Sequence, residues 1–341
     1  MRYKLLGRSG LRVSEICLGT MSFGTRWGFG GDMEACREVF DAFRERGGNF
    51  IDTANKYHEG ESERIVGNLV SDDRDRYVIA TKYSLSMASG DPNASGNGRK
   101  NLVRSVEGSL GRLGTDYIDL LYLHAWDFTT PEDEVLRGLD DLVRSGKVLY
   151  IGISDTPAWI VSRLQTTAEL RGWTRFVAMQ LQYSLLDRTP ERELLPMCEK
   201  LGIGVTCWGS LAQGLLTGKY TRATGEVDTM RTGASDRLND HNRAIAEAVD
   251  AVADELSTSS THVALAWVQR RGKQLFPIVG PRKRSQMDDC LGAVGVQLTD
   301  EQAQRLEAVA TVELGFPHDF LKGEFVRKVI YGDMLDRLEL P

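Results

Sequence analysis

The sequence has few cysteines and histidines, and their spacing does not suggest a structural bridge or a metal site. Its five cysteines are scattered over 341 residues without a C-x-x-C pair, so neither a disulfide framework nor a zinc site is indicated. No uninterrupted apolar run is long enough to cross a bilayer, and the first residues, MRYKLLGRSG, lack the apolar core of an export signal. We therefore expect a protein of the reducing cytoplasm with no membrane partner.

An excess of positive charge is also missing. The net charge is −6, which gives no general attraction for nucleic acid, so a phosphate group can be held only by a local basic cluster. The hydrophobic share of 41% and the charged share of 26% are ordinary for a folded globular chain. The expected partner is a small molecule, and assembly into a homo-oligomer is left open.

Short β-branched runs alternate with longer amphipathic stretches along the chain, which is typical of a parallel sheet with crossover helices. We expect a (β/α)₈ TIM barrel of class α/β, with an open doubly wound sheet as the competing fold. Residues 3–13 predict an N-terminal β-hairpin that closes the barrel floor. The expected strands centre on residues 16–18, 50–51, 78–80, 118–123, 150–151, 177–179, 205–207 and 277–279.

Helical periodicity and capping signals fill the intervals. Apolar residues repeat at helical spacing in residues 36–43 and 135–143. Thr-Pro pairs at 130–131, 156–157 and 189–190 predict a capping hydroxyl followed by proline at the first helical position. Thr299 and Gln302 predict a capping box.

The whole chain, residues 1–341, reads as one domain, with the barrel over about residues 14–311 and a tail over residues 312–341. Three long excursions, at residues 85–100, 218–242 and 311–341, are candidate walls of a substrate pocket. The tail contains Phe316, Phe320, Phe325 and Tyr331, so we expect it to fold over the barrel mouth.

Ionisable residues follow three consecutive strands, which is the main chemical signal in the sequence. Asp52, Lys82 and His124 each stand where a predicted strand ends, and these ends meet at one mouth of a barrel. Tyr57 follows Asp52 closely enough to turn into the same opening. A lysine held by a carboxylate would lower the pKa of the phenol and make Tyr57 a usable acid. Asp52 and His124 as ligands of a hydrolytic metal are the alternative, weakened by the small number of histidines.

These residues lie in motifs that resemble the aldo-keto reductases. The similar segments are NFIDTANKYHEGESERIVG, TKY, SVEGSLGRLGTDYIDLLYLH, GKVLYIGISDTPAW, QYSLL, GSLAQGLLTGKY and IVGPRKR, all in the family's order. The segments GNGRKN and HAWDFTTPEDEV are similar to the bacterial branch related to aryl-alcohol dehydrogenases. The resemblance implies a barrel enzyme whose catalytic residues are Asp52, Tyr57, Lys82 and His124.

The resemblance implies reduction of an aldehyde or ketone, either an aromatic carbonyl or a keto-sugar, by hydride from NADPH with Tyr57 as general acid. A regulatory or redox-sensing subunit that binds NADPH, like the potassium-channel β-subunits, is the alternative. No metal is implied. The implied substrate-binding residues are Met21, Tyr57, His124 and Trp126.

Cofactor-binding residues are implied in the same way. The basic run Arg282-Lys283-Arg284 follows the last predicted strand at a helix start, where a 2′-phosphate would be stabilised. Asp155 and Cys290 stand where the family usually has asparagine. The implied cofactor residues are Gly19, Thr20, Met21 and Asp52 at the nicotinamide ribose and reaction centre; Ser154, Asp155, Gln180 and Tyr183 (stacking) at the nicotinamide; Trp208, Gly209, Ser210, Leu211, Gln213, Gly214 and Lys219 at the pyrophosphate; and Gly280, Arg282, Gln286, Asp289 and Cys290 at the adenosine phosphate end.

Overall fold

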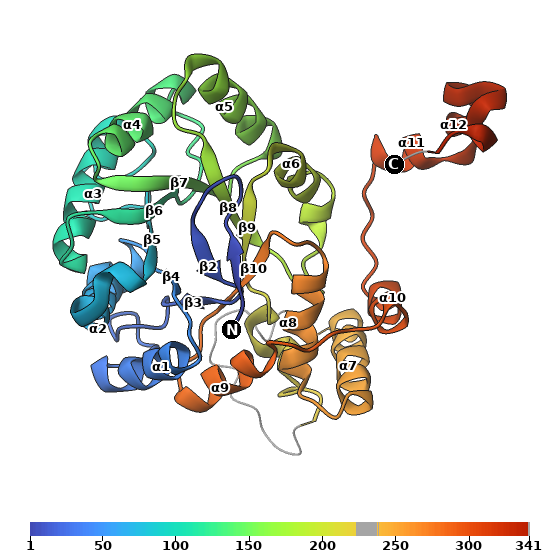
Figure 1. Cartoon of the computed structure of the whole chain (residues 1–341), viewed down its shortest axis with the longest axis horizontal. Helices are drawn as coiled ribbons and strands as arrows, with labels where there is room; N and C mark the ends of the chain where they lie inside the picture. Colours follow the sequence, from blue (N-terminus) through green and yellow to red (C-terminus); the bar gives the residue numbers. More distant parts are fainter. Residues whose placement is uncertain (223–236, 238, 340–341) are drawn as a thin grey trace.

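A closed barrel of eight parallel strands forms the centre of the molecule in the computed structural model, which describes residues 1–222, 237 and 239–339 (Figure 1). The last strand pairs with the first, with Ile278 opposite Cys17, which confirms the barrel and excludes the open sheet. All the predicted strands are present. They are β3 Cys17–Gly19, β4 Phe50–Asp52, β5 Val78–Tyr83, β6 Ile118–Leu123, β7 Val148–Ser154, β8 Phe176–Gln182, β9 Gly204–Trp208 and β10 Leu275–Val279.

A hairpin of β1 (Tyr3–Leu5) and β2 (Arg12–Ser14) crosses the end of the barrel nearest the viewer in Figure 1. Leu6 and Val13 are fully buried against the apolar side chains inside the barrel. Gly7 adopts φ +56°, and a Cβ there would lie 2.1 Å from the Val177 carbonyl oxygen, so the close approach requires glycine. The predicted floor is confirmed.

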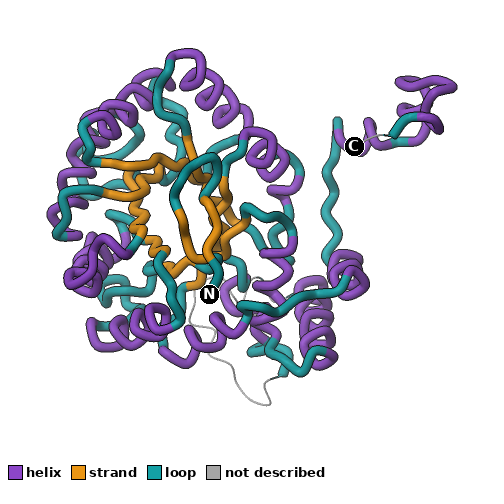
Figure 2. The backbone as a smooth tube through the Cα atoms, in the orientation of Figure 1, coloured by secondary structure: helices purple, strands orange, loops and turns teal. Residues whose placement is uncertain are grey.

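Helices surround the strands as an outer ring (Figure 2). Both predicted periodic stretches form helices with their apolar faces buried. The α-helices are α1 Met33–Glu45, α2 Glu61–Val70, α3 Arg99–Leu113, α4 Glu132–Arg144, α5 Ala158–Arg171, α6 Leu194–Leu201, α7 Asp240–Glu255, α8 Ser260–Arg270, α9 Arg284–Gly292, α10 Asp300–Val309, α11 His318–Lys322 and α12 Glu324–Tyr331. The 3₁₀ segments are η1 Tyr57–Gly60, η2 Ser71–Arg76, η3 Thr189–Glu191, η4 Ala212–Thr217 and η5 Gly332–Arg337. Among the helices of the described part of the chain, none is both long and apolar enough to cross a membrane.

The predicted threonine caps are wrong, although the helices begin close to the predicted places. Pro131 and Pro157 have ψ values of 135° and 143°, so each is the last residue before its helix rather than the first within it. Residues before proline avoid the helical region, which leaves the threonines in the loop. The Thr130 hydroxyl donates to Asp127 at 2.7 Å, and the Thr156 hydroxyl donates to the Ser154 carbonyl oxygen at 2.7 Å.

The third Thr-Pro pair begins the short η3 segment, which has no side-chain cap. The capping box of α10 is confirmed, because Thr299 and Gln302 exchange side-chain hydrogen bonds with each other's backbone amides at 3.2 and 3.1 Å.

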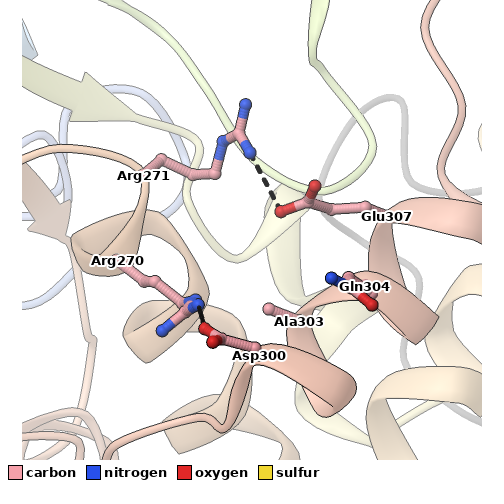
Figure 3. Close-up of a pocket in the computed structure, with 6 residues that line it drawn as sticks. All are labelled: Arg270, Arg271, Asp300, Ala303, Gln304 and Glu307. Carbon is pink, nitrogen blue, oxygen red and sulfur yellow. Dashed lines mark hydrogen bonds and ion pairs between the residues drawn. The ribbon is translucent and has the colours of Figure 1, made fainter.

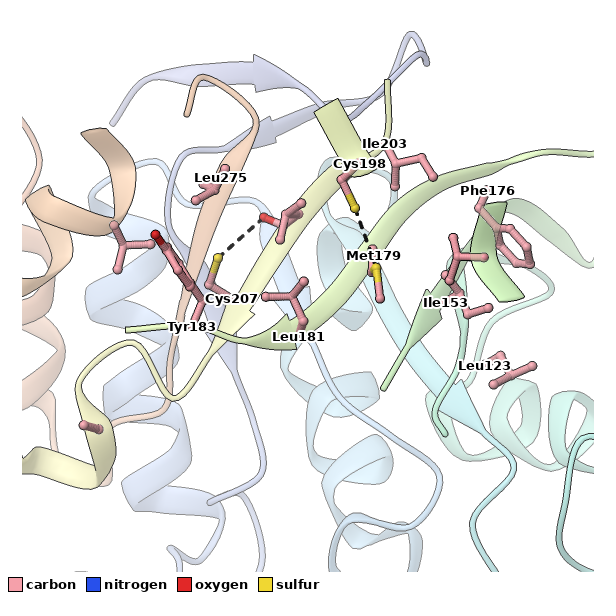
Figure 4. Packing of buried hydrophobic residues seen from close by; sticks show 14 of the residues in the cluster. Leu123, Ile153, Phe176, Met179, Leu181, Tyr183, Cys198, Ile203, Cys207 and Leu275 are labelled. Carbon is pink, nitrogen blue, oxygen red and sulfur yellow. Dashed lines mark hydrogen bonds between the residues drawn. The ribbon is translucent and has the colours of Figure 1, made fainter. Parts of the chain in front are cut away.

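Strand alternation divides the apolar core into an inner and an outer shell. Inside the barrel, Phe50, Ala80, Leu120 and Phe276 pack above the hairpin. The outer shell lies between strands and helices, and Figure 4 shows part of it around Met179, Leu181 and Cys198. The inward positions that follow Phe50 and Ala80 at the carboxyl ends of their strands are Asp52 and Lys82.

The long excursions differ from one another. The loop over residues 85–98 is tied to the next mouth loop, because Asn97 and Asp127 exchange hydrogen bonds of 2.7 and 2.9 Å between backbone amides and side-chain oxygens. Most of the excursion over residues 218–242 lies outside the described residues.

The tail contradicts the expectation that it covers the mouth, since α11, α12 and η5 extend outward beside the barrel (Figure 1). Contacts on the outer side direct it there. Arg192 donates to the Phe316 carbonyl oxygen at 2.8 Å, and His318 lies 2.9 Å from Glu193.

Candidate active site

The Lys82 ammonium group joins two of the other predicted catalytic residues, Asp52 and Tyr57, at the barrel mouth. Its Nζ lies 2.7 Å from Asp52 Oδ2 and 3.1 Å from the Tyr57 hydroxyl oxygen. A third hydrogen bond of 2.8 Å goes to the Thr53 carbonyl oxygen. Lys82 is fully buried, and each of its three N–H donors has an acceptor. The ammonium group is therefore rigidly held.

Gln180 fixes the other side of the carboxylate. Its Nε2 donates to Asp52 Oδ1 at 2.7 Å, so each oxygen of Asp52 accepts a hydrogen bond. The sequence had suggested Gln180 as a partner of the nicotinamide carboxamide, whereas its amide N–H is directed to Asp52. Because both carboxylate oxygens are engaged, the structure gives no support to Asp52 as a metal ligand.

Tyr57 stands at the start of η1, where the chain makes a tight turn. The two residues after it, His58 and Glu59, have left-handed φ values of 48° and 56°. The Lys82 Nζ lies 4.7 Å from the centre of the Tyr57 ring as well as against its hydroxyl. Since the lysine donates to the phenol oxygen, the phenol proton is left for another acceptor.

The pKa of Tyr57 is raised above its ordinary value, contrary to the expectation from sequence. Burial is the largest cause, and the nearby Lys82 cation only partly offsets it. The pKa of Lys82 is also raised: burial alone would lower it, but Asp52 and Tyr57 outweigh that effect. The site therefore pairs a protonated phenol with a charged ammonium group.

His124 completes the group as an uncharged ring. Its ring centre lies 6.0 Å from that of Tyr57, edge to face. Burial and the neighbouring Lys82 charge lower its pKa to about 3, so the imidazole is neutral at physiological pH. The Nδ1 atom is buried without a hydrogen-bond partner among the described residues. A neutral imidazole has one N–H donor with which to orient a carbonyl oxygen.

An aromatic loop beside Tyr57 was missed by the sequence analysis. Trp27 stacks on His58 with ring centres 4.7 Å apart and meets Tyr57 edge to face at 6.2 Å. The rings of Phe29 and His58 meet edge to face with their centres 5.4 Å apart. The Nε2 atom of His58 lies 3.0 Å from the Met21 carbonyl oxygen. The available signal was a pair of aromatic residues within a glycine-rich loop directly after the first barrel strand.

The predicted nicotinamide residues separate into accessible and structural ones. Met21 is 40% exposed at the mouth. The Thr20 hydroxyl is buried and donates to the Asp52 carbonyl oxygen at 2.9 Å, so it joins two strands. Gly19 leaves room for Ile278, because a Cβ there would lie 2.6 Å from the isoleucine side chain.

Asp155 and Trp208 meet at the mouth ends of β7 and β9. Asp155 follows Ser154, which is buried, and has φ 40°, a conformation that Asp and Asn tolerate better than most residues. The Trp208 Nε1 donates to Asp155 Oδ1 at 3.3 Å. Aspartate in place of asparagine therefore keeps the local backbone while adding a carboxylate.

The Tyr183 side chain lies in the outer shell rather than inside the barrel mouth, so the structure does not bring it to the predicted stacking position. Figure 4 shows Tyr183 among the buried residues of this shell. Its ring stacks on Trp267 with ring centres 5.5 Å apart, and its hydroxyl donates to Glu191 at 2.7 Å. Strand alternation explains the error, because Gln180 points inward and a residue three positions later points outward.

The segment after β9 forms a concave turn of backbone amides. Ala212, Gln213 and Gly214 have successive φ values of 47°, 59° and 94°. Turns with residues in the left-handed region can direct N–H groups toward one anion. The Gln213 Oε1 is buried without a partner among the residues described here.

The other predicted pyrophosphate residues around this turn have mixed environments. The Ser210 hydroxyl donates to the Cys207 carbonyl oxygen at 2.9 Å. The Lys219 Nζ lies 5.3 Å from the centre of the Tyr220 ring. Leu211 packs against the core, and Gly209 has φ 70°.

The start of α9 offers part of the predicted phosphate site. The chain passes from Gly280 to a helix start that has no side-chain cap, and the Gln286 side chain accepts from the Arg282 amide at 2.8 Å. Arg282 is exposed. Arg284 is instead paired with Glu45, which leaves Arg282 as the better phosphate partner.

Two residues predicted at the adenosine are engaged elsewhere. Cys290 is buried in the core beneath α9, so the structure does not present its thiol for the predicted contact, and this burial raises its pKa to about 12. The Asp289 carboxylate accepts from the Ser259 hydroxyl at 2.8 Å and lies 3.2 Å from His262. Trp126, predicted at the substrate, is half-buried and packs against the outer shell.

A polar hollow of about 450 Å³ lies elsewhere, between the carboxyl end of α8 and α10 (Figure 3). Arg271 pairs with Glu307 at 2.9 Å across it, and Arg270 pairs with Asp300. Its charges neutralise one another and it contains none of the predicted site residues.

The chain belongs to the aldo/keto reductase family, whose model matches residues 15–311. A norsolorinic acid reductase of Aspergillus flavus is 40% identical over 93% of this chain and 83% of its own. An aryl-alcohol dehydrogenase of Pestalotiopsis microspora is 39% identical over 94% and 85%, respectively. An aryl-alcohol dehydrogenase [NADP(+)] of Phanerodontia chrysosporium is 38% identical over 91% and 86%. The protein is an oxidoreductase of this family, and its relatives support carbonyl reduction.

Proposed function

We propose that this chain reduces an aldehyde or ketone to the alcohol with hydride from NADPH and a proton from Tyr57. The observation that carries the proposal is the buried chain of hydrogen bonds from Gln180 through Asp52 and Lys82 to the Tyr57 hydroxyl. A buried ion pair is a poor source of stability, so its presence directly above the apolar layer of the barrel favours a chemical role.

Each residue has a distinct task in this scheme. Lys82 holds the phenol oxygen, leaving its proton directed at the substrate, and Asp52 with Gln180 keeps the ammonium group in position. His124, neutral because its pKa is about 3, orients the carbonyl oxygen by a hydrogen bond. The carbonyl oxygen takes the Tyr57 proton as the carbon is reduced, and solvent later restores that proton. General acid catalysis of this kind contributes about 10²–10⁴-fold to the rate.

The mouth contains groups that fit a nicotinamide dinucleotide, which would supply the hydride. Trp208 and Asp155 offer an aromatic ring and a polar partner close to Tyr57, so Trp208 takes the stacking role that the sequence assigned to Tyr183. The amides of residues 212–214 suit a pyrophosphate. Arg282 at the uncapped start of α9 suits a 2′-phosphate, which favours NADPH over NADH.

An aromatic carbonyl is the favoured substrate class. Trp27 contacts Tyr57 directly, and Phe128 is exposed in the loop after β6. Aromatic walls of this kind suit planar rings. The names of the relatives, which refer to norsolorinic acid and aryl alcohols, agree with this choice. A keto-sugar is the second class to be tested.

The test is consumption of NADPH by the purified chain against matched panels of aromatic aldehydes, aromatic ketones and keto-sugars. We expect turnover of aromatic carbonyls, faster with NADPH than with NADH. Tight NADPH binding without turnover of any carbonyl would support the sensor alternative.

All five cysteines are buried and unpaired, in keeping with the reducing cytoplasm that we propose as its location.

A further inference from the structure

The C-terminal arm, residues 316–339, has an unusual concentration of exposed apolar side chains. A folded chain normally buries such residues or uses them for binding. Phe325 and Val329 lie one helical turn apart on α12 and are 78% and 68% exposed. The other large exposed apolar residues of the arm are Phe316, Phe320, Leu321, Ile330, Met334 and Leu338, each at least 42% exposed.

The arm's own barrel does not cover this surface. Polar contacts at Phe316 and His318 fix the base of the arm to Arg192 and Glu193. Beyond this base, α12 packs mainly on α11 and η5 within the arm, and Figure 2 shows these elements standing apart from the ring of helices. The family match ends at residue 311, so this segment lies outside the matched barrel.

The exposed area is the size that a stable association needs. A buried aromatic side chain contributes roughly 150–250 Å². Three phenylalanines and five aliphatic side chains, each at least 42% exposed, therefore present several hundred Å², on the order of the ~800 Å² per partner that a specific interface buries. Charged residues are interspersed along the arm, which suits a protein surface with a polar rim.

The barrel mouth exposes a complementary set of side chains. Phe128 in the loop after β6 is 69% exposed, and Trp159 at the start of α5 is 60% exposed. Met21, after β3, is 40% exposed. All three follow the carboxyl ends of barrel strands, so they surround the same opening as the four predicted catalytic residues.

We propose that the arm of one chain lies across the barrel mouth of a second copy, and that the exchange is reciprocal. A two-fold assembly forms two identical contacts at once, because every copy carries both an arm and a mouth. Each active site is then covered on one side by the partner's α12 rather than by its own tail. The partner that covers the apolar surface of the arm is thus a second copy of this chain.

The first test is the molecular mass in solution, measured by light scattering during gel filtration at micromolar concentration. The unmodified chain should have twice the mass of one chain. Phe325→Asp combined with Val329→Asp should halve that mass, and both sites are exposed, so the barrel should fold normally. Leu170→Asp is the matched control, because Leu170 is 82% exposed at the other end of the barrel, on α5. A monomeric parent, or a dimeric arm variant, would overturn the proposal.

The second test locates the contact by cross-linking. Every native cysteine is buried, so Phe325→Cys and Phe128→Cys each introduce one accessible thiol. Mixing the two variants with a short bis-maleimide should give a cross-linked heterodimer, several-fold more than Phe325→Cys mixed with Leu170→Cys. Equal cross-linking to both partners, or cross-linking only between two Phe325→Cys arms, would contradict arm-to-mouth exchange. Neither readout depends on turnover, so a failure of the proposed reaction would be recognised separately.

Discussion

Two layers inside the same barrel follow the same strand geometry but have opposite chemistry. On β4 the inward residues are Phe50 and then Asp52, and on β5 they are Ala80 and then Lys82. The lower layer packs with apolar neighbours, whereas the upper layer forms a hydrogen-bonded ionic network. Since burying charge is costly and apolar replacements would satisfy the fold, the difference indicates that the upper layer serves chemistry.

Removing the upper layer's proton donor should give the largest effect on rate. Tyr57→Phe keeps the ring and loses the acid, so kcat for carbonyl reduction should fall by about 10²–10⁴-fold. The affinity for NADPH, followed by fluorescence titration, should change little. Normal kcat in this variant would show that another group donates the proton.

Truncating the lower layer should instead affect stability. Phe50 is fully buried, so Phe50→Ala should cost about 3–5 kcal/mol in the free energy of unfolding. Activity per folded molecule should remain near normal at low temperature. Leu170→Ala, at an exposed position, is the control and should change stability by less than about 0.5 kcal/mol. Urea unfolding measures the stability and kcat measures the activity of each variant. Equal destabilisation by Phe50→Ala and Leu170→Ala would contradict the layer assignment.

The cofactor end provides a smaller, more selective comparison. Arg282→Ala should weaken NADPH binding by roughly 10- to 100-fold, as expected for one charge-assisted hydrogen bond, and leave NADH binding almost unchanged. Arg284→Ala is a matched control, because that side chain is paired with Glu45. Titration of both cofactors against both variants tests this. Equal losses for NADPH and NADH in Arg282→Ala would refute a phosphate contact.

The smallest expected effect is an absence of titration by His124. Burial and the Lys82 charge lower its pKa from the ordinary value to about 3, so the ring is uncharged throughout the range from pH 5 to 9. The kcat profile of reduction should show no inflection from imidazole, and only protonation below about pH 3 would charge it. An inflection near pH 6.5 that disappears in His124→Gln would contradict the neutral role.

The sequence predicts the parts of the site that follow from strand order and alternation. Asp52, Lys82 and His124 end consecutive strands, so a barrel necessarily brings them to one mouth. The family motif alone does not place Tyr183, because alternation along β8 directs its side chain outward, away from the inward-pointing Gln180. The raised pKa of Tyr57 could not be foreseen, since it depends on how deeply the folded chain buries the phenol.

Other differences depend on tertiary contacts that no local pattern records. Arg284 was predicted at the phosphate, yet a glutamate 239 positions earlier in the chain pairs with it. The tail was predicted over the mouth from its aromatic content. Aromatic content indicates that a surface will be buried, but contacts at Arg192 and Glu193 decide its direction.

The most direct test of the central claim is a double-mutant cycle of Tyr57→Phe and Lys82→Met, measured as single-turnover reduction with NADPH bound. Lys82 lowers the pKa of Tyr57 against the larger effect of burial, so its loss should raise that pKa further and move the alkaline limit of activity upward. In Lys82→Met the buried Asp52 carboxylate loses its cationic partner, which can destabilise the fold. Circular dichroism therefore checks that each variant is folded. If both residues form one proton-transfer unit, the double variant should be about as slow as the slower single variant. A double variant whose losses multiply would show that Lys82 and Tyr57 act separately and would contradict the account.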